Sequence, residues 1–337
     1  MFNFKNDYSK IAHKNILEAL LKYSDENNIG YGLDKHSLNA KNLIKKHLKK
    51  DSDIHFLVGG TSANKTVISH SLRPYEAVIS VETGHIFVHE TGAIEQTGHK
   101  IITVKGENGK ITANEIINVL KTHTDEHMVY PKMVYISQST EIGTVYTKSE
   151  LLEISKVCKE NNLCLFIDGA RLSVALNKSD ITLADLEEYS DVFYIGGTKI
   201  GALLGEAVVI SNDEIKNNFR YSIKQNGGMY AKGFVAGIQF EELFKDNLYF
   251  ELGKNENEAA DYLALELEKR NINLAYPNVT NQLFIEVSNR LFEDLKQIVL
   301  FELWEDKGNS KIIRFVTDFS MNKEYVDKFL IELDKLL

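Results

Sequence analysis

Leu163-Cys164-Leu165-Phe166-Ile167-Asp168-Gly169-Ala170-Arg171 is the stretch that decides the fold class. Its apolar run stops abruptly at an acid, which is typical of a buried parallel strand that delivers a charge at its carboxyl end. The stretch Val192-Phe193-Tyr194-Ile195-Gly196-Gly197-Thr198-Lys199 repeats this shape and delivers a lysine. We therefore expect two strand ends that aim one carboxylate and one amine at a shared crevice.

Short apolar runs alternate with helical patterns between about residues 54 and 210, which indicates an α/β domain with a mainly parallel sheet. The candidate strands are Ala77–Val81, Ile101–Val104, Met133–Ser137, Leu163–Ile167, Val192–Ile195 and Ala207–Ile210. Two of the intervening helices begin with a capping box, at Thr112 with Glu115 and at Thr147 with Glu150.

The pattern changes after Gly228 to a long helix over about residues 231–270, interrupted near Asn247 and Gly253. A smaller α+β unit follows, with strands near 283–287 and 312–316 and helices near 290–299 and 323–336. Because a single core rarely grows past about 250–300 residues, the 337-residue chain is expected to form two domains. We predict a large domain over 1–250, which includes an N-terminal arm, and a small domain over 251–337.

Composition narrows the class of function. The net charge of -9 opposes binding to nucleic acid or to an anionic membrane, and no apolar run approaches the roughly 20 residues that span a bilayer. The first residues lack the pattern of a signal peptide. Only Cys158 and Cys164 occur, so a disulfide framework is not expected and the cytoplasm is the simplest compartment. No metal site is predicted.

The pair of Asp168 and Lys199 suits pyridoxal phosphate. The lysine holds the aldehyde of this cofactor as a Schiff base, and the acid keeps the pyridine nitrogen protonated so that the ring can accept electrons. An aspartate at the end of a fully apolar strand needs a cationic or strongly donating partner, which a pyridinium supplies. The alternative interpretation is a helix-capping Asp168 with Arg171 as its surface partner and Lys199 as an ordinary solvated lysine.

Two further motifs follow the ends of strands. Gly59-Gly60-Thr61-Ser62 begins a helical pattern, where glycines and free amides favour phosphate; on its own the motif also fits a turn with a helix cap. His85 follows the strand at 77–81, and a neutral imidazole there can lie flat on an aromatic cofactor, although a lone histidine is more often a surface or capping residue. Gly60, His85, Asp168 and Lys199 are all expected at one sheet edge.

With these residues assembled, the chain resembles the threonine aldolase and β-eliminating lyase family of fold-type-I pyridoxal-phosphate enzymes. The matching pieces run over nearly the whole chain and are Asn6-Asp7, Tyr31-Gly32-Leu33-Asp34, Gly60-Thr61-Ser62-Ala63-Asn64, His85 with Glu90, Asp168-Gly169-Ala170-Arg171, Thr198-Lys199 and Arg314-Phe315-Val316-Thr317. The resemblance implies an aspartate-aminotransferase-like large domain, with a mainly parallel seven-stranded sheet, and a small C-terminal α+β domain.

The resemblance also implies a role for each matching residue. Lys199 would hold pyridoxal phosphate, Asp168 would pair with its pyridine nitrogen and His85 would stack on its ring. Gly60 and Thr61 would bind the phosphate. The substrate-binding residues would be Asn6, Tyr31, Arg171 and Arg314, with the two arginines on the substrate carboxylate and Asn6 at a usual serine position. Tyr31 would reach towards a neighbouring subunit's site, which implies a dimer or a dimer of dimers.

The chain departs from the family pattern at two positions. Glu141 stands where members commonly have a histidine near the β-hydroxyl group of the substrate, and a carboxylate can take a proton only if its pKa suits the task. Tyr230 stands where members have an arginine, and it cannot replace that permanent charge. Contacts with phosphate or with a second subunit are then expected from Lys224 or Lys232.

The leading hypothesis is an aldolase that cleaves the Cα–Cβ bond of a β-hydroxy-α-amino acid, such as L-threonine or L-allo-threonine, to glycine and an aldehyde. A β-eliminating lyase or an aminotransferase would use the same Lys199 and Asp168, so this alternative stays open. A noncatalytic protein that retains the fold is a second alternative. A dehydrogenase is disfavoured because no glycine fingerprint follows the first strand.

Overall fold

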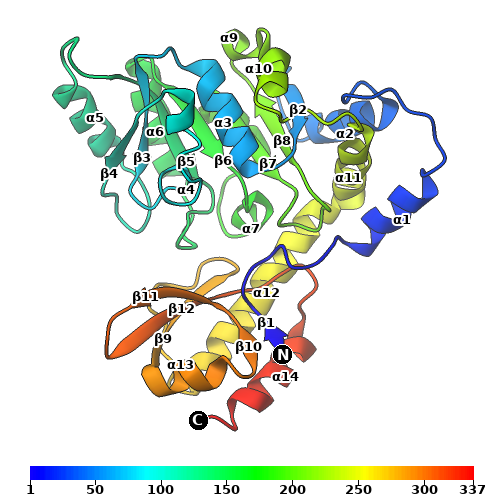
Figure 1. Cartoon of the computed structure of the whole chain (residues 1–337), viewed down its shortest axis with the longest axis vertical. Coiled ribbons are helices and arrows are strands. Elements are labelled where there is room, and N and C mark those ends of the chain that lie inside the picture. The colour runs from blue at the N-terminus through cyan, green and yellow to red at the C-terminus, as the bar shows by residue number, and fades with distance from the viewer.

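Seven strands form one sheet in the larger part of the molecule, as the computed structural model shows for residues 1–337 (Figure 1). In spatial order they are β2 (Asp53–Leu57), β8 (Glu206–Ile210), β7 (Val192–Gly196), β6 (Cys164–Asp168), β5 (Tyr130–Ser137), β3 (Glu76–Val81) and β4 (Ile101–Val104). The strands from β4 to β7 run parallel, whereas β8 is antiparallel to both of its neighbours. The predicted mainly parallel, seven-stranded sheet is confirmed.

Helices cover both faces of this sheet (Figure 1). Those between its strands are α3 (Gly60–Ser71), α4 (His85–Val88), α5 (Ala113–Thr122), α6 (Lys148–Glu160), α7 (Leu172–Leu176) and α8 (Leu183–Tyr189), with the short 3-10 turn η1 (Glu95–Thr97). The helices outside the sheet are α1 (Lys14–Lys22), α2 (Lys35–Lys45), α9 (Asp213–Lys216), α10 (Phe219–Gln225) and α11 (Phe234–Phe244). No helix is both long enough and apolar enough to cross a membrane.

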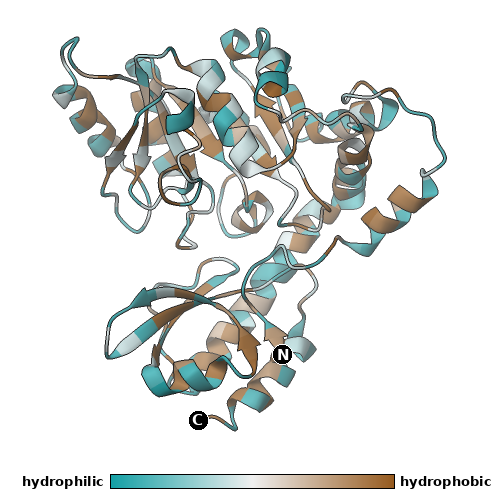
Figure 2. Ribbon diagram, in the orientation of Figure 1, coloured by the Kyte–Doolittle hydropathy of each residue, from teal (hydrophilic) through white to brown (hydrophobic).

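Successive residues of the central strands pack into two different cores. Leu165 and Ile167 of β6 belong to a cluster shared with α6 and α11, whereas Phe166 belongs to a cluster shared with α3 and α10. A strand that is apolar on both faces is the signature of a covered parallel sheet. Figure 2 shows these strands in hydrophobic colours between helices with hydrophilic outer faces.

The predicted long helix is divided once. It forms α11 and α12 (Leu248–Lys269), separated by the 3-10 turn η2 (Lys245–Asn247), where Asp246 and Asn247 have left-handed backbone angles. The break predicted at Gly253 is wrong, because this residue lies inside α12. A Cβ atom there would come within 2.2 Å of Ser173 Oγ, so the glycine allows α12 and α7 to approach closely.

The smaller part contains a three-stranded antiparallel sheet in the order β11-β12-β9. Its elements are β9 (Gln282–Ser288), α13 (Asn289–Leu295), β10 (Val299–Leu300), β11 (Glu302–Asp306), β12 (Ser310–Val316) and α14 (Lys323–Leu333). The helix predicted over 290–299 ends at Leu295, and Val299 begins β10 instead. This strand pairs in parallel with β1 (Phe2–Asn3) at the other end of the chain, a partner that local sequence cannot reveal.

The two parts are joined by α12, which extends from the large sheet into the small part (Figure 1). The small part has its own apolar cluster, which includes residues of α12, β9, β12 and α14. Phe4 belongs to this cluster, so the first residues of the chain pack with the C-terminal part. We propose that the domain boundary lies near residue 250, at the start of α12.

Candidate active site

Asp168 is the best-supported side chain at the carboxyl edge of the sheet. It ends β6 and is 3% exposed. Tyr194 Oη and Ala170 N donate to Oδ1 at 2.5 and 2.9 Å, while Tyr135 Oη and Asn64 Nδ2 donate to Oδ2 at 2.5 and 3.1 Å. Burial raises the pKa of Asp168, but the charge of His85 and the tyrosine hydroxyls outweigh it and lower the pKa. The carboxylate is therefore held ionised.

Lys199 lies in the loop between β7 and β8 and lines a cavity of about 610 Å³. Burial, followed by the charge of Arg171, lowers the pKa of Lys199 to about 8, against the opposing charges of Asp7, Asp168 and Glu206. About a tenth of an amine with this pKa is neutral at pH 7, far more than of an ordinary lysine, and the neutral form is the nucleophile that attacks an aldehyde.

His85 begins α4 and lines the same cavity. Its Nδ1 lies 2.7 Å from Oε1 of Glu90, whose side chain is fully buried. Asn64 Nδ2 donates both to this oxygen of Glu90, at 2.7 Å, and to Asp168. A continuous polar chain therefore connects the imidazole with the Asp168 carboxylate and fixes the position of the ring.

The first turn of α3 is an open anion cradle. No side chain caps this helix, and the hydroxyl of Ser62 is buried without a hydrogen-bond partner. A Cβ atom on Gly60 would lie 3.0 Å from Tyr194 Oη, so the helix terminus adjoins the hydroxyl that binds Asp168. Free backbone amides, the helix dipole and an unpartnered hydroxyl suit a phosphate group. Thr61, in the same turn, is exposed.

Glu141 follows β5 and lines the cavity with Lys199 and His85. Ser137 Oγ and the backbone N of His85 donate to Oε1 at 2.7 and 2.9 Å, whereas Oε2 is buried without a partner. Burial raises the pKa of Glu141, and the nearby charge of Asp168 adds to this effect. The group is thus poised to exchange a proton with a molecule in the cavity.

The two predicted carboxylate-binding arginines both line the cavity but differ in their partners. Asp7, which is buried, accepts from Nε and Nη2 of Arg171 at 2.6 and 3.1 Å. Arg314 donates weakly to Gln282, at 3.3 Å, and its Nε is buried without a partner. Burial and the charge of Arg171 lower the pKa of Arg314. An anion between the two guanidinium groups would relieve this repulsion.

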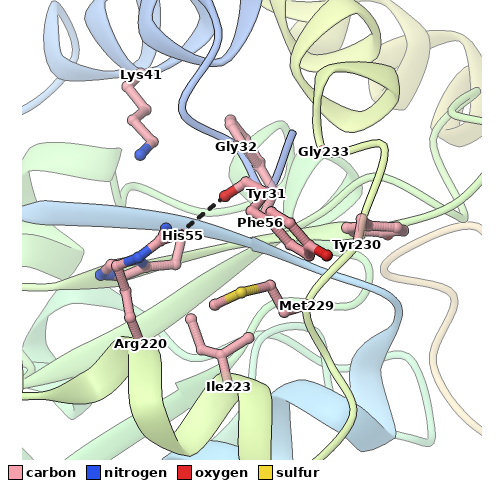
Figure 3. Close-up of a pocket in the computed structure, with 10 residues that line it drawn as sticks. All are labelled: Tyr31, Gly32, Lys41, His55, Phe56, Arg220, Ile223, Met229, Tyr230 and Gly233. Carbon is pink, nitrogen blue, oxygen red and sulfur yellow. Dashed lines mark hydrogen bonds between the residues drawn. The ribbon is translucent and has the colours of Figure 1, made fainter. Parts of the chain in front are cut away.

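Two predicted substrate-binding residues lie away from the cavity. Asn6 Oδ1 accepts from Tyr8 N and Ser9 Oγ at 3.1 and 2.8 Å, and so closes a turn. Tyr31 belongs instead to a separate pocket of about 20 Å³ with Lys41, His55 and Arg220 (Figure 3). Within one chain, neither side chain faces Lys199.

Tyr230 does not supply the charge of the arginine that it replaces. Its hydroxyl donates to the Leu57 carbonyl at 2.9 Å and secures its loop to the end of β2. Cations gather around Tyr31 instead. Arg220 Nη2 donates to its carbonyl at 3.1 Å (Figure 3), and Lys224 Nζ lies 5.1 Å from the centre of its ring. Of the two predicted substitutes, Lys224 is therefore beside Tyr31.

The residues present fit pyridoxal phosphate. Lys199 offers an amine of lowered pKa, Asp168 a charge that matches a protonated pyridine nitrogen, and α3 an uncapped terminus with a spare hydroxyl for the phosphate. When bound, this cofactor supplies a ring that withdraws electrons from the bonds at the Cα atom of an amino acid. The imidazole of His85 supplies an apolar face for such a ring.

Several residues of the site escape the sequence analysis. Tyr135 and Tyr194 alternate with core residues on β5 and β7, so each reads as part of an apolar strand. Both tyrosines lie on the strands that flank β6, with Tyr135 paired to Phe166, two residues before Asp168, and this placement is the signal that could have found them. Asp7 is different, because nothing local indicates that it pairs with Arg171, more than 160 positions away.

Comparison with known proteins adds three findings. The family model described as beta-eliminating lyase matches residues 13–290. A low specificity L-threonine aldolase from Pseudomonas sp. (strain NCIMB 10558) is 32% identical over 283 residues, covering 82% of either chain. The solved structure of a Leishmania major threonine aldolase has a TM-score of 0.98 and 45% identity, and covers 100% of this chain and 99% of that one.

A more distant likeness concerns the fold alone. A mutant aspartate aminotransferase from Thermus thermophilus has a TM-score of 0.73 at 13% identity, with 99% of this chain and 96% of that chain covered. The aspartate-aminotransferase-like architecture expected from the sequence is thereby confirmed.

Proposed function

Because the chain belongs to the beta-eliminating lyase family and is thus an enzyme of the lyase class, we propose that it is a pyridoxal-phosphate-dependent aldolase. Its substrate would be a β-hydroxy-α-amino acid such as L-threonine or L-allo-threonine, which it would cleave to glycine and an aldehyde. The threonine aldolases from Pseudomonas and Leishmania support this choice. The observation that carries it is the cavity in which Lys199, Glu141 and two arginines meet.

Binding and orientation would depend on the two arginines. Arg171 is fixed in direction because Asp7 holds two of its nitrogens, and Arg314 has a buried Nε without a partner that can donate to an anion. A carboxylate bound between them sets the rotation about the substrate's Cα atom. Because that rotation decides which bond can be broken, the clamp selects the Cα–Cβ bond.

Proton transfer would fall to Glu141. Its unpartnered Oε2 can accept the proton of the β-hydroxyl group as the Cα–Cβ bond breaks and the aldehyde forms. The raised pKa makes this carboxylate a stronger base than an ordinary one, and the bonds to Oε1 hold it in place. A proton returned to the Cα atom then completes glycine, so that threonine yields glycine and acetaldehyde in equal amounts.

A substrate assay tests this function. The purified protein with pyridoxal phosphate should absorb at about 420 nm and should form equal amounts of glycine and acetaldehyde from L-threonine. Lys199→Ala should abolish both signals, whereas Lys328→Ala, a change at an exposed lysine, should leave both intact. Pyruvate and ammonia from serine without glycine from threonine would favour the β-eliminating alternative. No absorbance at this wavelength would contradict the cofactor assignment and support a noncatalytic role.

The assembly is expected to be a homodimer or a dimer of dimers. Apolar side chains of the N-terminal segment are exposed, namely Ile11, Leu17, Leu21, Ile29, Leu33 and Leu38. Exposed apolar residues in this density are typical of a surface that a partner covers. Sedimentation analysis should give at least twice the mass of one chain. The thiols of Cys158 and Cys164 are free, which suits the cytoplasmic location that cell fractionation would check.

A further inference from the structure

Glu206 is a buried carboxylate at the base of the loop that carries Lys199. It is the first residue of β8 and lies opposite Gly196, the last residue of β7, in the antiparallel register. Only 5% of the residue is exposed. The loop 197–205 therefore leaves the sheet and returns to it beside this one side chain.

Both carboxylate oxygens of Glu206 bind that loop. The backbone N of Gly197 donates to Oε2 at 2.8 Å, and the hydroxyl of Thr198 donates to Oε1 at 2.8 Å. The same hydroxyl oxygen accepts from Gly205 N at 3.0 Å, so one side chain ties the two ends of the loop together. These contacts fix the two residues that immediately precede Lys199.

Charge links Glu206 to Lys199 as well. Burial raises the pKa of Glu206 to about 7, although the bonds from Gly197 and Thr198 and the charge of Lys199 lower it. The negative charge of Glu206 in turn raises the pKa of Lys199, against burial. Above pH 7 an ionised Glu206 thus stabilises a positive charge on the lysine nitrogen.

The other titratable groups near the pair are either balanced by a partner or neutral. They are Asp7, Asp168, Arg171, Tyr194, Tyr230 and Tyr249. Asp7 pairs with Arg171, and Asp168 accepts four hydrogen bonds. Tyr194 and Tyr249 are buried and Tyr230 is half-buried, and the pKa values of all three are raised, so they stay neutral. Glu206 differs from both carboxylates, because it has neither an arginine partner nor four hydrogen-bond donors.

We propose that Glu206 is a positioning residue for Lys199, which anchors the loop ahead of the lysine and favours a protonated nitrogen at its end. This inference rests on the proposed function, in which Lys199 holds the aldehyde of pyridoxal phosphate. The bond so formed contains a nitrogen whose protonated form absorbs at about 420 nm, so its state can be read directly.

A spectral titration of the holoenzyme tests the proposal. Glu206→Gln keeps the size of the side chain and can still accept the bond from Gly197, but it carries no charge. We expect it to lower the pH midpoint of the 420 nm band by about one unit. Glu206→Asp keeps the charge and should move the midpoint by less. In cofactor-free protein, Glu206→Gln should also raise the labelling rate of Lys199 by an amine-reactive reagent at pH 7 by about fivefold.

Glu187→Gln is the matched control. This glutamate is also buried and binds a loop through both oxygens, since it accepts from Lys49 N, Lys50 N and Ser52 Oγ. It should leave the midpoint unchanged. Equal midpoints in wild type and Glu206→Gln, or an equal shift in Glu206→Asp, would overturn the proposal. A wild-type protein that never develops the band would instead contradict the proposed function.

Discussion

Asp168, which is buried, and Glu141, which is half-buried, lie at the same edge of the sheet, and their surroundings lower the pKa of Asp168 but raise that of Glu141. Asp168 ends β6 and pairs in register with Ser137 of β5, whose hydroxyl binds Glu141. Four donors divide between the two oxygens of Asp168, whereas both donors to Glu141 reach the same oxygen. Burial alone therefore does not set the charge of a carboxylate; nearby charges, such as that of His85 beside Asp168, and the number and distribution of hydrogen-bond donors also set it.

The largest effect is expected from Asp168→Asn, which keeps the shape of the side chain and removes the charge. Formation of glycine from L-threonine should fall about 10³-fold, since the charge that would keep the pyridine nitrogen of the cofactor protonated is lost. Asp191→Asn is the control, because Asp191 binds the backbone N of Leu165 at the opposite edge of the sheet. If Asp168→Asn retained the wild-type rate, the electrostatic role assigned to Asp168 would be contradicted.

Glu141→Gln should lower the same rate by about 10²-fold, because the amide cannot take the β-hydroxyl proton. In the wild type, activity should rise with pH through the raised pKa of Glu141, since only the ionised form accepts a proton. In the variant this rise should disappear from the pH–rate profile. Glu302→Gln changes a second glutamate of the cavity and should keep the rise. A rise that survives in Glu141→Gln would assign it to another group.

Tyr135→Phe makes Asp168 more like Glu141 by removing one of its donors. The pKa of Asp168, which lies below its ordinary value of 3.8, should increase by about one unit, so activity should fall by up to about tenfold at pH values near or below about 4 and stay unchanged near neutral pH. Tyr249→Phe, at a buried tyrosine that bonds to Ser173 N, serves as control. The idea that donors keep Asp168 ionised would fail if the acidic limb of the profile did not move.

The smallest effect concerns stability. The folded-state pKa of Glu141 lies above its ordinary value of 4.5, so its ionisation favours the unfolded chain and destabilises the protein as pH rises past 4.5. Glu141→Gln should therefore raise the melting temperature by about 2 °C at pH 8, with no gain at pH 4. The pKa of Asp168 is lowered, so its ionised form stabilises the folded chain at pH values above its ordinary pKa of 3.8. Asp168→Asn should therefore lower the melting temperature at pH 8. Calorimetry of the cofactor-free variants measures these melting temperatures. Changes of the same sign and size in Glu141→Gln and Asp168→Asn at pH 8 would contradict the comparison.

The sequence analysis locates the site because its residues stand at the ends of recognisable strands. Asp168 and Lys199 are predicted on that basis, and the structure places both at the predicted edge. The strand β2 is missed as an individual element, since Asp53-Ile54-His55-Phe56-Leu57 is short and lacks the continuous apolar run of the central strands. It exists because the apolar strand β8 pairs along its whole length.

What could not be predicted depends on contacts between distant parts of the chain. The bond between Asp7 and Arg171 and the capture of Val299 by the first strand involve partners that no local pattern joins. The unequal distribution of donors around Glu141 is likewise a matter of atomic geometry. The sequence shows that position 141 carries a carboxylate, but only the folded structure shows which of its oxygens has no hydrogen-bond donor.

The short strand β1 has a practical consequence for engineering the protein. It fixes Phe2 and Asn3 on the small part, while Asp7, a few positions on, holds Arg171 in the cavity. The intervening residues behave as a strap of set length. A slip of one residue in the β1 pairing would displace Asp7 by about 3.3 Å, more than the 2.6 Å bond that it makes. Affinity tags and fusions are therefore safer at the other end of the chain.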